Sequence, residues 1–316
     1  MKTILILGGF GFLGTNILKY IDAYLQAQYR VIVFDKFTQH PRNVSFKCID
    51  KTYSGDFMNS ELLARIFSEN HIDLVIHSLS TTVPVDSSNA RYDVESNLLP
   101  TIDILNLMVK HEVKDIVYLS SGGAIYGTKG HEKHKETDDV FPISSYGVIK
   151  HTIEKYLMQY AQLNGIRPLI LRLSNPYGAY HYSMKQGVIN VAMAKAVNEE
   201  KMQIWGDGNG KKDYIYVNDF TTILFKLLDA KIHTEVINIA SGTLLSVNEI
   251  ANAVVKFVPT FEVEHIDAEK YDANQFALDT SKLKSLIGEY KFTPLAEGLK
   301  LTYNWTKENK EVWKKE

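Results

Sequence analysis

Short apolar segments alternate with longer segments of helical spacing through the first two thirds of this chain. The apolar segments are rich in Val and Ile and several are almost continuously hydrophobic, which is typical of strands that are covered on both faces. The predicted strands are Thr3–Leu7, Val31–Asp35, Phe46–Ile49, Asp73–His77, Asp115–Ser120, Pro168–Leu173 and Val236–Ala240. The clearest predicted helices are Leu13–Leu25, Glu61–Asn70, Val94–His111 and Ser145–Asn164. Strand and helix in alternation predict an α/β fold with a doubly wound parallel sheet.

The alternation ends after Leu173, where a loop, one helix and a glycine-rich turn follow. We therefore predict two domains, the second one smaller and discontinuous. A nucleotide-binding domain is expected to contain residues 1–178 and 215–240, and a substrate-binding domain residues 179–214 and 241–316. Ligands in such folds bind at the carboxyl ends of the strands.

Composition excludes several classes of protein. The 316 residues are 45% hydrophobic and 23% charged, which is ordinary for a folded domain and excludes wholesale disorder. The net charge of −2 argues against a nucleic-acid binder with a broad basic surface. No apolar run approaches the ~18 residues of a membrane span. The single cysteine, Cys48, excludes an internal disulfide and suits a reducing compartment. We expect a cytoplasmic protein with neither membrane nor nucleic-acid partners.

The first predicted strand runs directly into a glycine-rich turn. Gly8, Gly11 and Gly14 follow at regular intervals, and Phe12 and Leu13 lie before the last of them. This spacing lets the chain turn tightly and lets its backbone approach a pyrophosphate at a helix N-terminus. Glycine-rich turns are common, so the alternative is an α/β turn without a ligand.

An acidic residue at the end of the second predicted strand strengthens the dinucleotide interpretation. Asp35 lies 21 residues beyond Gly14, close to the separation of about 20 found in dinucleotide sites. A carboxylate there accepts hydrogen bonds from the adenosine ribose and repels a 2′-phosphate, which favours NAD over NADP. Lys36, also a cofactor candidate, weakens this preference. Asp56 and Phe57 are candidates for contacts with adenine, unless Asp56 instead caps the next helix.

A tyrosine and a lysine form the second motif. Tyr146 and Lys150 lie at i and i+4, on one face of a predicted helix that Ser144 or Ser145 can cap. Tyr303 and Lys307 have the same spacing, so the pair alone is not specific. Only the first pair follows a loop, Ser120–Gly127, where the active-site crevice should lie.

The residue types of the first pair suit proton transfer. A free phenol titrates near ~10. A close ammonium and a positive nicotinamide ring both favour phenolate, so Tyr146 can act as a base near neutral pH. Lys150 can also hydrogen-bond the nicotinamide ribose. The alternative is an ordinary surface pair on a helix.

Together these residues resemble the extended short-chain dehydrogenase/reductase family, and within it the NAD-dependent nucleotide-sugar epimerases and dehydratases with their Rossmann domain. The resemblance covers nearly the whole chain and is greatest to relatives of UDP-glucose 4-epimerase. Besides the motifs above, it rests on His77–Pro84, Asn97, Ser120–Gly127, Arg172–Gly178 and Trp205–Asp219.

The resemblance implies a mechanism and further site residues. Tyr146 would deprotonate the sugar 4-hydroxyl while C4 gives a hydride to NAD⁺, and hydride would return to the opposite face of the 4-keto sugar. Ser121 would join Tyr146 and Lys150 as the third catalytic residue. The further positions implied for the cofactor are Ser78, Leu79, Ser80, Thr82, Asn97, Ser120 and Ser174. The positions implied for the substrate are Thr82, Gly122, Asn175, Gln186, Gly187, Val188 and Lys212.

The loop after the fifth strand departs from the family pattern. Gly122 stands where the family usually has Ser or Thr, so Ser121 or Ser120 has to supply the hydroxyl. The Thr-Asp-Glu set of the 4,6-dehydratases would fall on Gly122, Gly123 and Ala124. Without that acid and base we expect no dehydration.

Two departures concern the diphosphate. Lys212 replaces an Arg of the family and gives a point charge without a bidentate fork. Glu269 stands where a second Arg is expected, with Lys270 beside it as a compensating cation.

Two other reactive groups receive ordinary structural interpretations. His131–His134 lies in a charged segment and is predicted to be a solvated loop rather than a metal site. Cys48 is predicted to be a small core residue rather than a nucleophile. No metal is expected.

Three functions remain open. The first is NAD-dependent epimerisation of a nucleotide-diphosphate sugar at C4, and the second is reduction of a 4-keto nucleotide sugar with NAD(P)H. The third is a non-catalytic NAD-binding protein. By family analogy, Val94–His111 and Ser145–Asn164 would form the interface of a homodimer.

Overall fold

The chain forms two compact units. The computed structural model describes residues 1–37, 44–83, 89–127, 133–267 and 276–313. Unit 1 contains Met1–Gly127, Asp139–Leu173 and Leu224–Ile237, and unit 2 contains Thr128–Asp138, Ser174–Ile223 and Asn238–Glu316. The unit changes after Leu173 rather than after residue 178, because β7 (Asn175–Tyr177) pairs with a strand of unit 2. Of residues 215–240, only Leu224–Ile237 belongs to unit 1.

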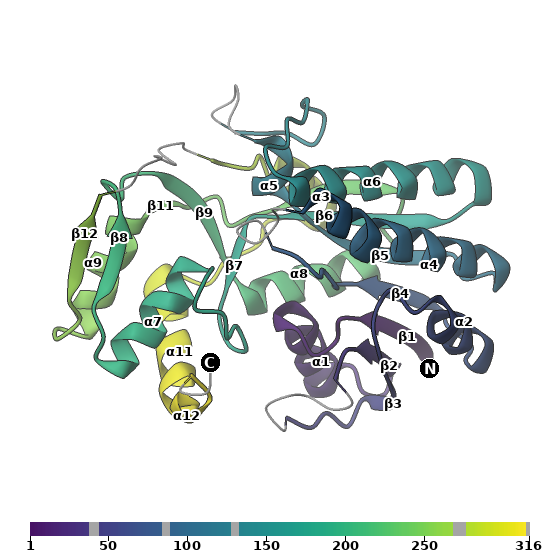
Figure 1. The fold of residues 1–316 in the computed structure, drawn as a ribbon, viewed down its shortest axis with the longest axis horizontal. Coiled ribbons are helices and arrows are strands. Elements are labelled where there is room, and N and C mark those ends of the chain that lie inside the picture. The colour runs from purple at the N-terminus through teal and green to yellow at the C-terminus, as the bar shows by residue number, and fades with distance from the viewer. Residues whose placement is uncertain (38–43, 84–88, 128–132, 268–275, 314–316) are drawn as a thin grey trace. The chain divides into compact units, whose positions relative to one another are not determined.

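Unit 1 is built around a seven-stranded sheet with the order β10-β6-β5-β4-β1-β2-β3. Its strands are β1 (Lys2–Leu7), β2 (Tyr29–Asp35), β3 (Ile49–Ser54), β4 (Leu74–His77), β5 (Asp115–Ser121), β6 (Arg167–Leu173) and β10 (Glu235–Ile239). All strand pairs from β6 to β3 are parallel. Starting from β1, the chain builds the sheet outward in both directions, which confirms the predicted doubly wound fold (Figure 1).

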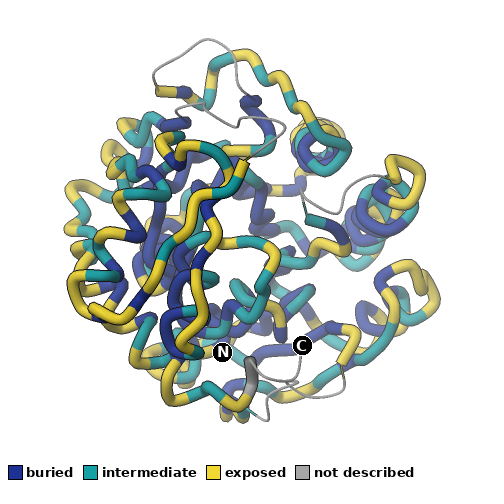
Figure 2. The backbone as a smooth tube through the Cα atoms, turned by 60° about the vertical axis from the view of Figure 1, so that its left-hand side comes forward, coloured by how far each residue is buried: buried dark blue, intermediate teal, exposed yellow. Residues whose placement is uncertain are grey.

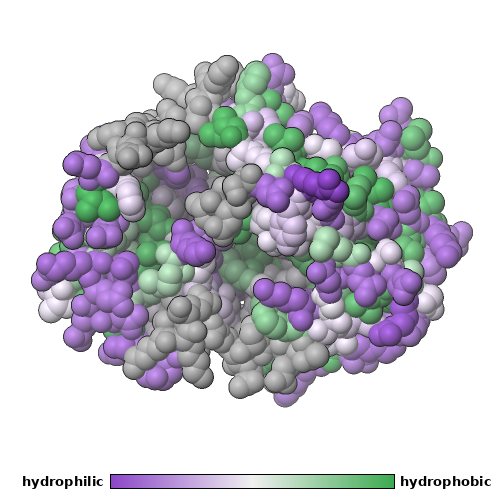
Figure 3. Space-filling view, viewed as in Figure 1, coloured by the Kyte–Doolittle hydropathy of each residue, from purple (hydrophilic) through white to green (hydrophobic). Residues whose placement is uncertain are grey.

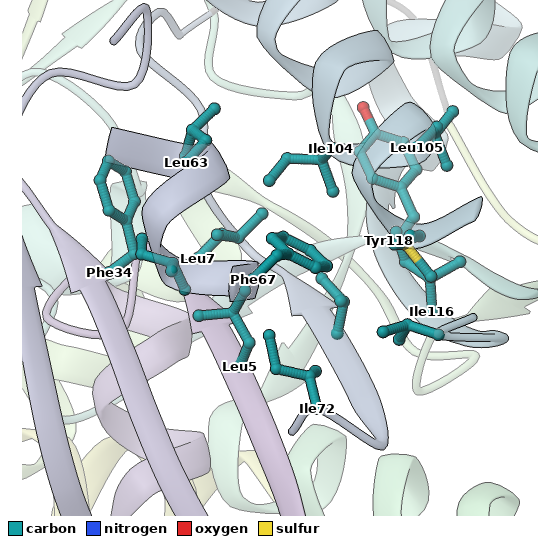
Figure 4. Packing of buried hydrophobic residues seen from close by; sticks show 14 of the residues in the cluster. Leu5, Leu7, Phe34, Leu63, Phe67, Ile72, Ile104, Leu105, Ile116 and Tyr118 are labelled. Atoms are coloured by element: carbon teal, nitrogen blue, oxygen red, sulfur yellow. The ribbon is translucent and has the colours of Figure 1, made fainter. Parts of the chain in front are cut away.

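Helices cover both faces of this sheet. They are α1 (Phe12–Tyr24), α2 (Ser60–Glu69), α3 (Ala90–Asp93), α4 (Leu99–Lys110), α5 (Gly122–Tyr126), α6 (Ser145–Asn164) and α8 (Val217–Asp229). Helices α2, α4 and α6 share one core with the sheet, and Figure 4 shows Leu63, Phe67 and Ile104 packed against residues of the strands. On α1, Tyr20 stacks on Phe225 of α8 at 4.9 Å between ring centroids. Apart from the edge strand β3, the strands are therefore mostly buried, as their sequence predicts (Figure 2).

The third strand does not lie where the apolar run predicted it. The sequence favours Phe46–Ile49, but β3 is Ile49–Ser54. Phe46 and Cys48 lie before the strand and are buried. The Cys48 N–H donates to Asp22 Oδ1 at 2.8 Å. The true strand lies at the sheet edge and only Tyr53 of its six residues is buried, so its sequence lacks a continuous apolar signal.

The helix predicted over Val94–His111 is interrupted. A π-helical turn, Val94–Leu98, joins α3 to α4. Pro100 lies in the first turn of α4. Proline has no N–H to donate to the preceding turn and its ring crowds the carbonyl there, so the wider turn accommodates it.

Unit 2 is a mixed assembly with its own core. Its elements are β7, α7 (Val188–Asn198), β8 (Met202–Trp205), β9 (Lys211–Tyr216), β11 (Leu244–Ser246), α9 (Val247–Phe257), β12 (Val263–Ile266), α10 (Ser281–Ile287), α11 (Leu295–Glu308) and α12 (Lys310–Trp313). Strand β9 pairs with β7 in parallel and with β11 in antiparallel orientation, and β12 pairs with β8. Within the described ranges, no helix combines the length and the hydropathy needed to cross a membrane.

Candidate functional site

The glycine-rich turn joins β1 to α1 and is compact. Gly8 has φ +78°, and a Cβ on Gly14 would lie 2.2 Å from the Gly8 carbonyl oxygen. These two glycines are therefore required by the turn itself. Gly11 is exposed, and a Cβ there would lie 3.4 Å from its nearest neighbour, so the turn tolerates a side chain. The open space at Gly11, the N-cap residue of α1, is what a ligand would use.

No acidic side chain occupies the start of α1. Gly11 provides no side-chain cap, and the first turn, with Phe12 and Leu13, has no Asp or Glu. The partial positive charge of a helix N-terminus is thus available to a phosphate.

Asp35 ends β2 and is buried. Its Oδ2 accepts a hydrogen bond from the Phe10 N–H at 2.9 Å, and its Oδ1 accepts from the Phe37 N–H at 3.4 Å. Burial raises the pKa of Asp35, although these backbone donors and the Lys36 charge oppose the shift. Asp35 therefore ties the glycine-rich turn to β2 and retains lone pairs for a further donor.

The two candidates after β3 differ. Asp56 is exposed, and its Oδ1 accepts from the Met58 N–H at 2.8 Å. It does not cap α2, since Asn59 is the N-cap residue and accepts from the Leu62 N–H. Phe57 is a core residue, 3% exposed, with its ring edge-on to His77.

The segment after β4 is held by its own side chains. Ser78 Oγ donates to the Leu7 carbonyl at 2.8 Å, and Ser80 Oγ donates to the Thr82 carbonyl at 2.9 Å. Asn97 Oδ1 accepts from the Thr81 N–H at 2.8 Å. Asn97 therefore fixes the shape of this segment. Pro84 lies outside the described residues.

A small, partly open pocket lies between this segment and α6. It brings together predicted residues from three parts of the chain, namely Leu79, Ser80, Thr82, Asn97, Tyr146 and Lys150. Its other lining residues are His77, Thr101, Tyr118, Ile149 and Ile153. None of these five was predicted as a cofactor or substrate contact, because each lies in a strand or helix whose apolar pattern predicts core.

Helix α6 positions the Tyr/Lys pair. Ser144 caps it by accepting from the Gly147 N–H at 3.1 Å, as predicted. A Cβ on Gly147 would lie 2.2 Å from the Ala124 carbonyl oxygen, so glycine after Tyr146 lets α6 pack against α5. Lys150 Nζ donates to the Leu119 carbonyl at 2.9 Å and lies 5.6 Å from the Tyr146 ring centroid.

The pKa shifts of this pair come mainly from burial. Burial raises the pKa of Tyr146 to about 12, and a hydrogen bond with Ser121 opposes the rise. Burial lowers the pKa of Lys150 to about 8, and the Glu154 carboxylate opposes that fall. The prediction that the ammonium and a positive nicotinamide ring together favour phenolate concerns the cofactor-bound enzyme, and without cofactor burial keeps the phenol protonated.

The two serines of β5 have different partners. Ser121 hydrogen-bonds Tyr146 and also caps α5. Ser120 Oγ donates to Glu154 Oε1 at 2.7 Å. The hydroxyl beside Tyr146 thus comes from Ser121, next to the buried backbone of Gly122.

The substrate candidates of unit 2 lie on its strands and at the start of α7. The Asn175 amide donates to the Asp213 carbonyl at 2.8 Å, and Lys212 precedes that residue on β9. The Ser174 N–H donates to the Ile239 carbonyl at 2.9 Å, the Asp213 carboxylate accepts from the Ser241 N–H at 2.9 Å, and burial raises the pKa of Asp213 to about 6.

Gly187 has φ +81° and is the N-cap residue of α7, with Gln186 before it and Val188 after it. A Cβ on Gly187 would lie 2.7 Å from the His181 ring, so only glycine fits there. Glu269 and Lys270 lie outside the described residues.

Cys48 and His134 show no sign of a reactive or metal-binding role. Burial and Asp22 raise the pKa of the Cys48 thiol to about 12, which opposes a nucleophilic role. His134 was expected in a solvated loop but is buried, and its ring stacks on Phe276. His131 and Glu132 lie outside the described residues, among which no cluster of metal-ligating side chains occurs.

Comparison with known proteins decides the family. The model of the NAD-dependent epimerase/dehydratase family matches residues 4–240. The chain belongs to this family. A putative UDP-glucose 4-epimerase of Methanocaldococcus jannaschii is 32% identical over 97% of this chain and 99% of its own. A dTDP-4-dehydro-6-deoxyglucose reductase of Escherichia coli is 28% identical over 94% of this chain and 95% of its own.

The fold agrees with a solved structure of the same group. UDP-glucose 4-epimerase of Thermotoga maritima, determined with UDP-glucose, has a TM-score of 0.86 and 27% identity, and the match covers 97% of this chain and 99% of that one. The resemblance seen in the motifs is thereby confirmed, and the protein is a NAD-dependent enzyme.

The residues of unit 1 fit NAD. Gly11 leaves open backbone at the start of α1, and Asp35 retains acceptor capacity at the end of β2. Lys150 and Tyr146 line the cavity where a nicotinamide ribose would lie. Bound NAD⁺ would supply the hydride acceptor and a positive charge close to the phenol.

Proposed function

We propose that this enzyme epimerises a nucleotide-diphosphate sugar, with C4 as the reacting carbon. The observation that carries the proposal is the position of Tyr146. Its phenol lines the cavity of unit 1, is hydrogen-bonded by Ser121 and lies beside the buried ammonium of Lys150. Family membership and the relatives named as UDP-glucose 4-epimerases support this reaction.

Tyr146 would take the proton of the C4 hydroxyl and later return it. Ser121 would hold the phenol and the substrate oxygen in one hydrogen-bonded line. Lys150, fixed by the Leu119 carbonyl, would stabilise the phenolate that forms.

We propose the substrate-binding residues of each unit separately. In unit 1 we assign Thr82 and the small Gly122, and in unit 2 the remaining predicted positions, which are Asn175, Gln186, Gly187, Val188 and Lys212. The bound UDP-glucose in the Thermotoga maritima relative favours a UDP sugar.

Reduction of a 4-keto nucleotide sugar is the second candidate, because one relative is named as such a reductase. The Tyr/Lys pair serves both reactions. Dehydration is disfavoured, since Gly122, Gly123 and Ala124 offer no acid or base. A non-catalytic NAD-binding protein would have no use for a buried lysine beside a cavity-lining phenol.

Incubation with UDP-glucose, UDP-N-acetylglucosamine and their galacto forms, followed by NMR, tests the proposal. An epimerase interconverts one gluco/galacto pair without added cofactor and retains NAD through purification. Turnover only with added NADPH would establish the reductase instead.

We also propose a homodimer through the face of unit 1 formed by α3, α4 and α6. Large apolar side chains are exposed there at Tyr92, Leu99, Val148, Met158 and Leu163. Figure 3 shows hydrophobic surface between polar groups over the region where Figure 1 places α4 and α6. Light scattering should give twice the mass of 35.9 kDa, and Leu99→Glu should yield monomer. A wild-type monomer would contradict the proposed dimer.

We also propose a cytoplasmic location, with which a single cysteine, Cys48, is consistent.

A further inference from the structure

A buried ion pair lies directly behind the Tyr/Lys pair. Arg172 of β6 and Glu154 of α6 have side chains that are 5% and 3% exposed, and Arg172 Nη2 lies 2.7 Å from Glu154 Oε2. The Arg172 Nε donates to both carboxylate oxygens, at 3.1 and 3.2 Å. A buried ion pair is weak evidence for stability, because desolvation offsets the attraction. Its place therefore suggests a role in the reaction.

Three consecutive residues at the end of β5 bind three turns of α6. The Leu119 carbonyl accepts from Lys150 Nζ, Ser120 Oγ donates to Glu154 Oε1, and Ser121 hydrogen-bonds Tyr146. Glu154 lies one turn beyond Lys150 on the same helix face. The hydrogen bond between Ser120 and Glu154 thus holds the end of β5, where Leu119 contacts Lys150 and Ser121 contacts Tyr146.

Arg172 extends this network to α5. Its Nη1 donates to Tyr126 Oη at 2.8 Å, and its guanidinium lies over the Tyr126 ring. His151 Nδ1 lies 3.4 Å from Glu154 Oε2. The carboxylate is thereby fixed from β5, β6 and α6.

Glu154 also determines the charge around Lys150. The titratable groups that face the ammonium are Tyr146 and Glu154 on α6, Tyr118 on β5 and His77 on β4. Burial raises the pKa of Tyr118 and lowers the pKa of His77 to about 3, so both are neutral near pH 7. Among these groups, Glu154 alone brings a negative charge.

We propose that Glu154, clamped by Arg172, is a positioning residue that keeps Lys150 cationic and holds Ser120 and Ser121 in register with the Tyr/Lys pair. This inference rests on the proposed function, in which Lys150 works as a cation beside Tyr146. It predicts that the charge of Glu154 matters for the pH range of the reaction, and that its bond to Ser120 matters for the rate.

The test follows the Lys150 side chain itself. Protein labelled with ¹³Cε-lysine is titrated by NMR, and the Lys150 signal is assigned by its loss in Lys150→Met. Glu154→Gln should lower the pKa of Lys150 by about one unit, and the alkaline limb of kcat should move down by the same amount. Glu154→Asp, which keeps the charge, should restore most of both shifts.

Two further variants separate position from charge. Ser120→Ala keeps the ion pair, so it should lower kcat several-fold while KM and the Lys150 titration stay unchanged. Glu95→Gln removes a carboxylate from the exposed Arg91–Glu95 pair of the same unit and should change nothing. If Glu154→Gln fails to fold because Arg172 is left unpaired, the double variant Glu154→Gln/Arg172→Gln replaces it, and because it also removes the Arg172 cation, the pKa of Lys150 should fall by less than in the single variant.

An unchanged Lys150 titration and an unchanged alkaline limb in a folded Glu154 variant would overturn the inference. That result is distinct from failure of the proposed function, which would appear as full activity of Tyr146→Phe whatever happens at Glu154.

Discussion

Tyr146 and Tyr303 begin the same pattern, a tyrosine with a lysine four positions later, on helices of different units. Around Tyr146, Lys150 is buried and bound to Leu119, and Ser121 hydrogen-bonds the phenol. Tyr303 packs edge-on against Phe257 of α9, and Lys307 is exposed. The comparison teaches that the i, i+4 spacing alone does not make a catalytic pair. The end of β5, which contacts Tyr146 and Lys150, distinguishes the first pair from the second.

The largest difference is expected when each phenol is removed. Tyr146→Phe should lower kcat by about 10²–10⁴-fold, because a general acid–base residue contributes that much. Tyr303→Phe should leave kcat within about twofold, since its ring contact with Phe257 is retained. Steady-state epimerisation assays measure both. Equal losses of kcat in the two variants would contradict a catalytic role specific to Tyr146.

Removal of the lysines is expected to have the next largest effect. Lys150→Met should lower kcat by about 100-fold, because it removes a fixed charge beside the developing phenolate. Lys307→Met, at an exposed position, should have no measurable effect. Thermal unfolding of both variants checks that the fold is intact. Full activity of folded Lys150→Met would break the assignment.

A smaller effect is expected when Ser121, the hydrogen-bond partner of Tyr146, is replaced. Ser121→Ala removes one hydrogen bond to the phenol and should lower kcat by about tenfold, roughly the value of one such bond. Ser121→Thr keeps the hydroxyl and should recover most of the rate. A Thr variant as slow as the Ala variant would show that packing, not the hydroxyl, is what Ser121 supplies.

The smallest effect concerns pH. The pKa of Lys150 is lowered to about 8, so its cationic form is lost as pH rises through that value. The account predicts that kcat falls several-fold between about pH 7.5 and 9. A profile of kcat against pH, with Lys307→Met as the control, measures this. A rate that stays level to pH 10 would contradict a required Lys150 cation.

The sequence predicted the sheet and the positions of the main motifs. Strands covered on both faces leave continuous runs such as that in β1, and Gly8 and Gly14 are obligatory in the turn after it. Edge strand β3 was misplaced because, of its six residues, only Tyr53 is buried. The apolar sequence pattern thus fails to locate a strand that is only partly buried.

The site was predictable only where a residue type is rare or its spacing is fixed. Tyr146, Lys150 and Asp35 satisfy this, and the structure brings the first two to one cavity. Tyr118 and His77 line the same cavity but look like core residues in their strands. The choice between Ser120 and Ser121 also required coordinates, because strand alternation directs neighbouring hydroxyls to different partners.

The most direct test of the central claim is the titration of the Tyr146 phenol itself, followed by ultraviolet difference absorption between wild type and Tyr146→Phe. Without cofactor, the phenol should titrate near pH 12, as burial dictates. With NAD⁺ bound, its apparent pKa should fall by several units toward neutrality, because a positive charge is brought close to the phenol. The same pKa in both states would contradict the account, as would an identical drop in the signal of Tyr303.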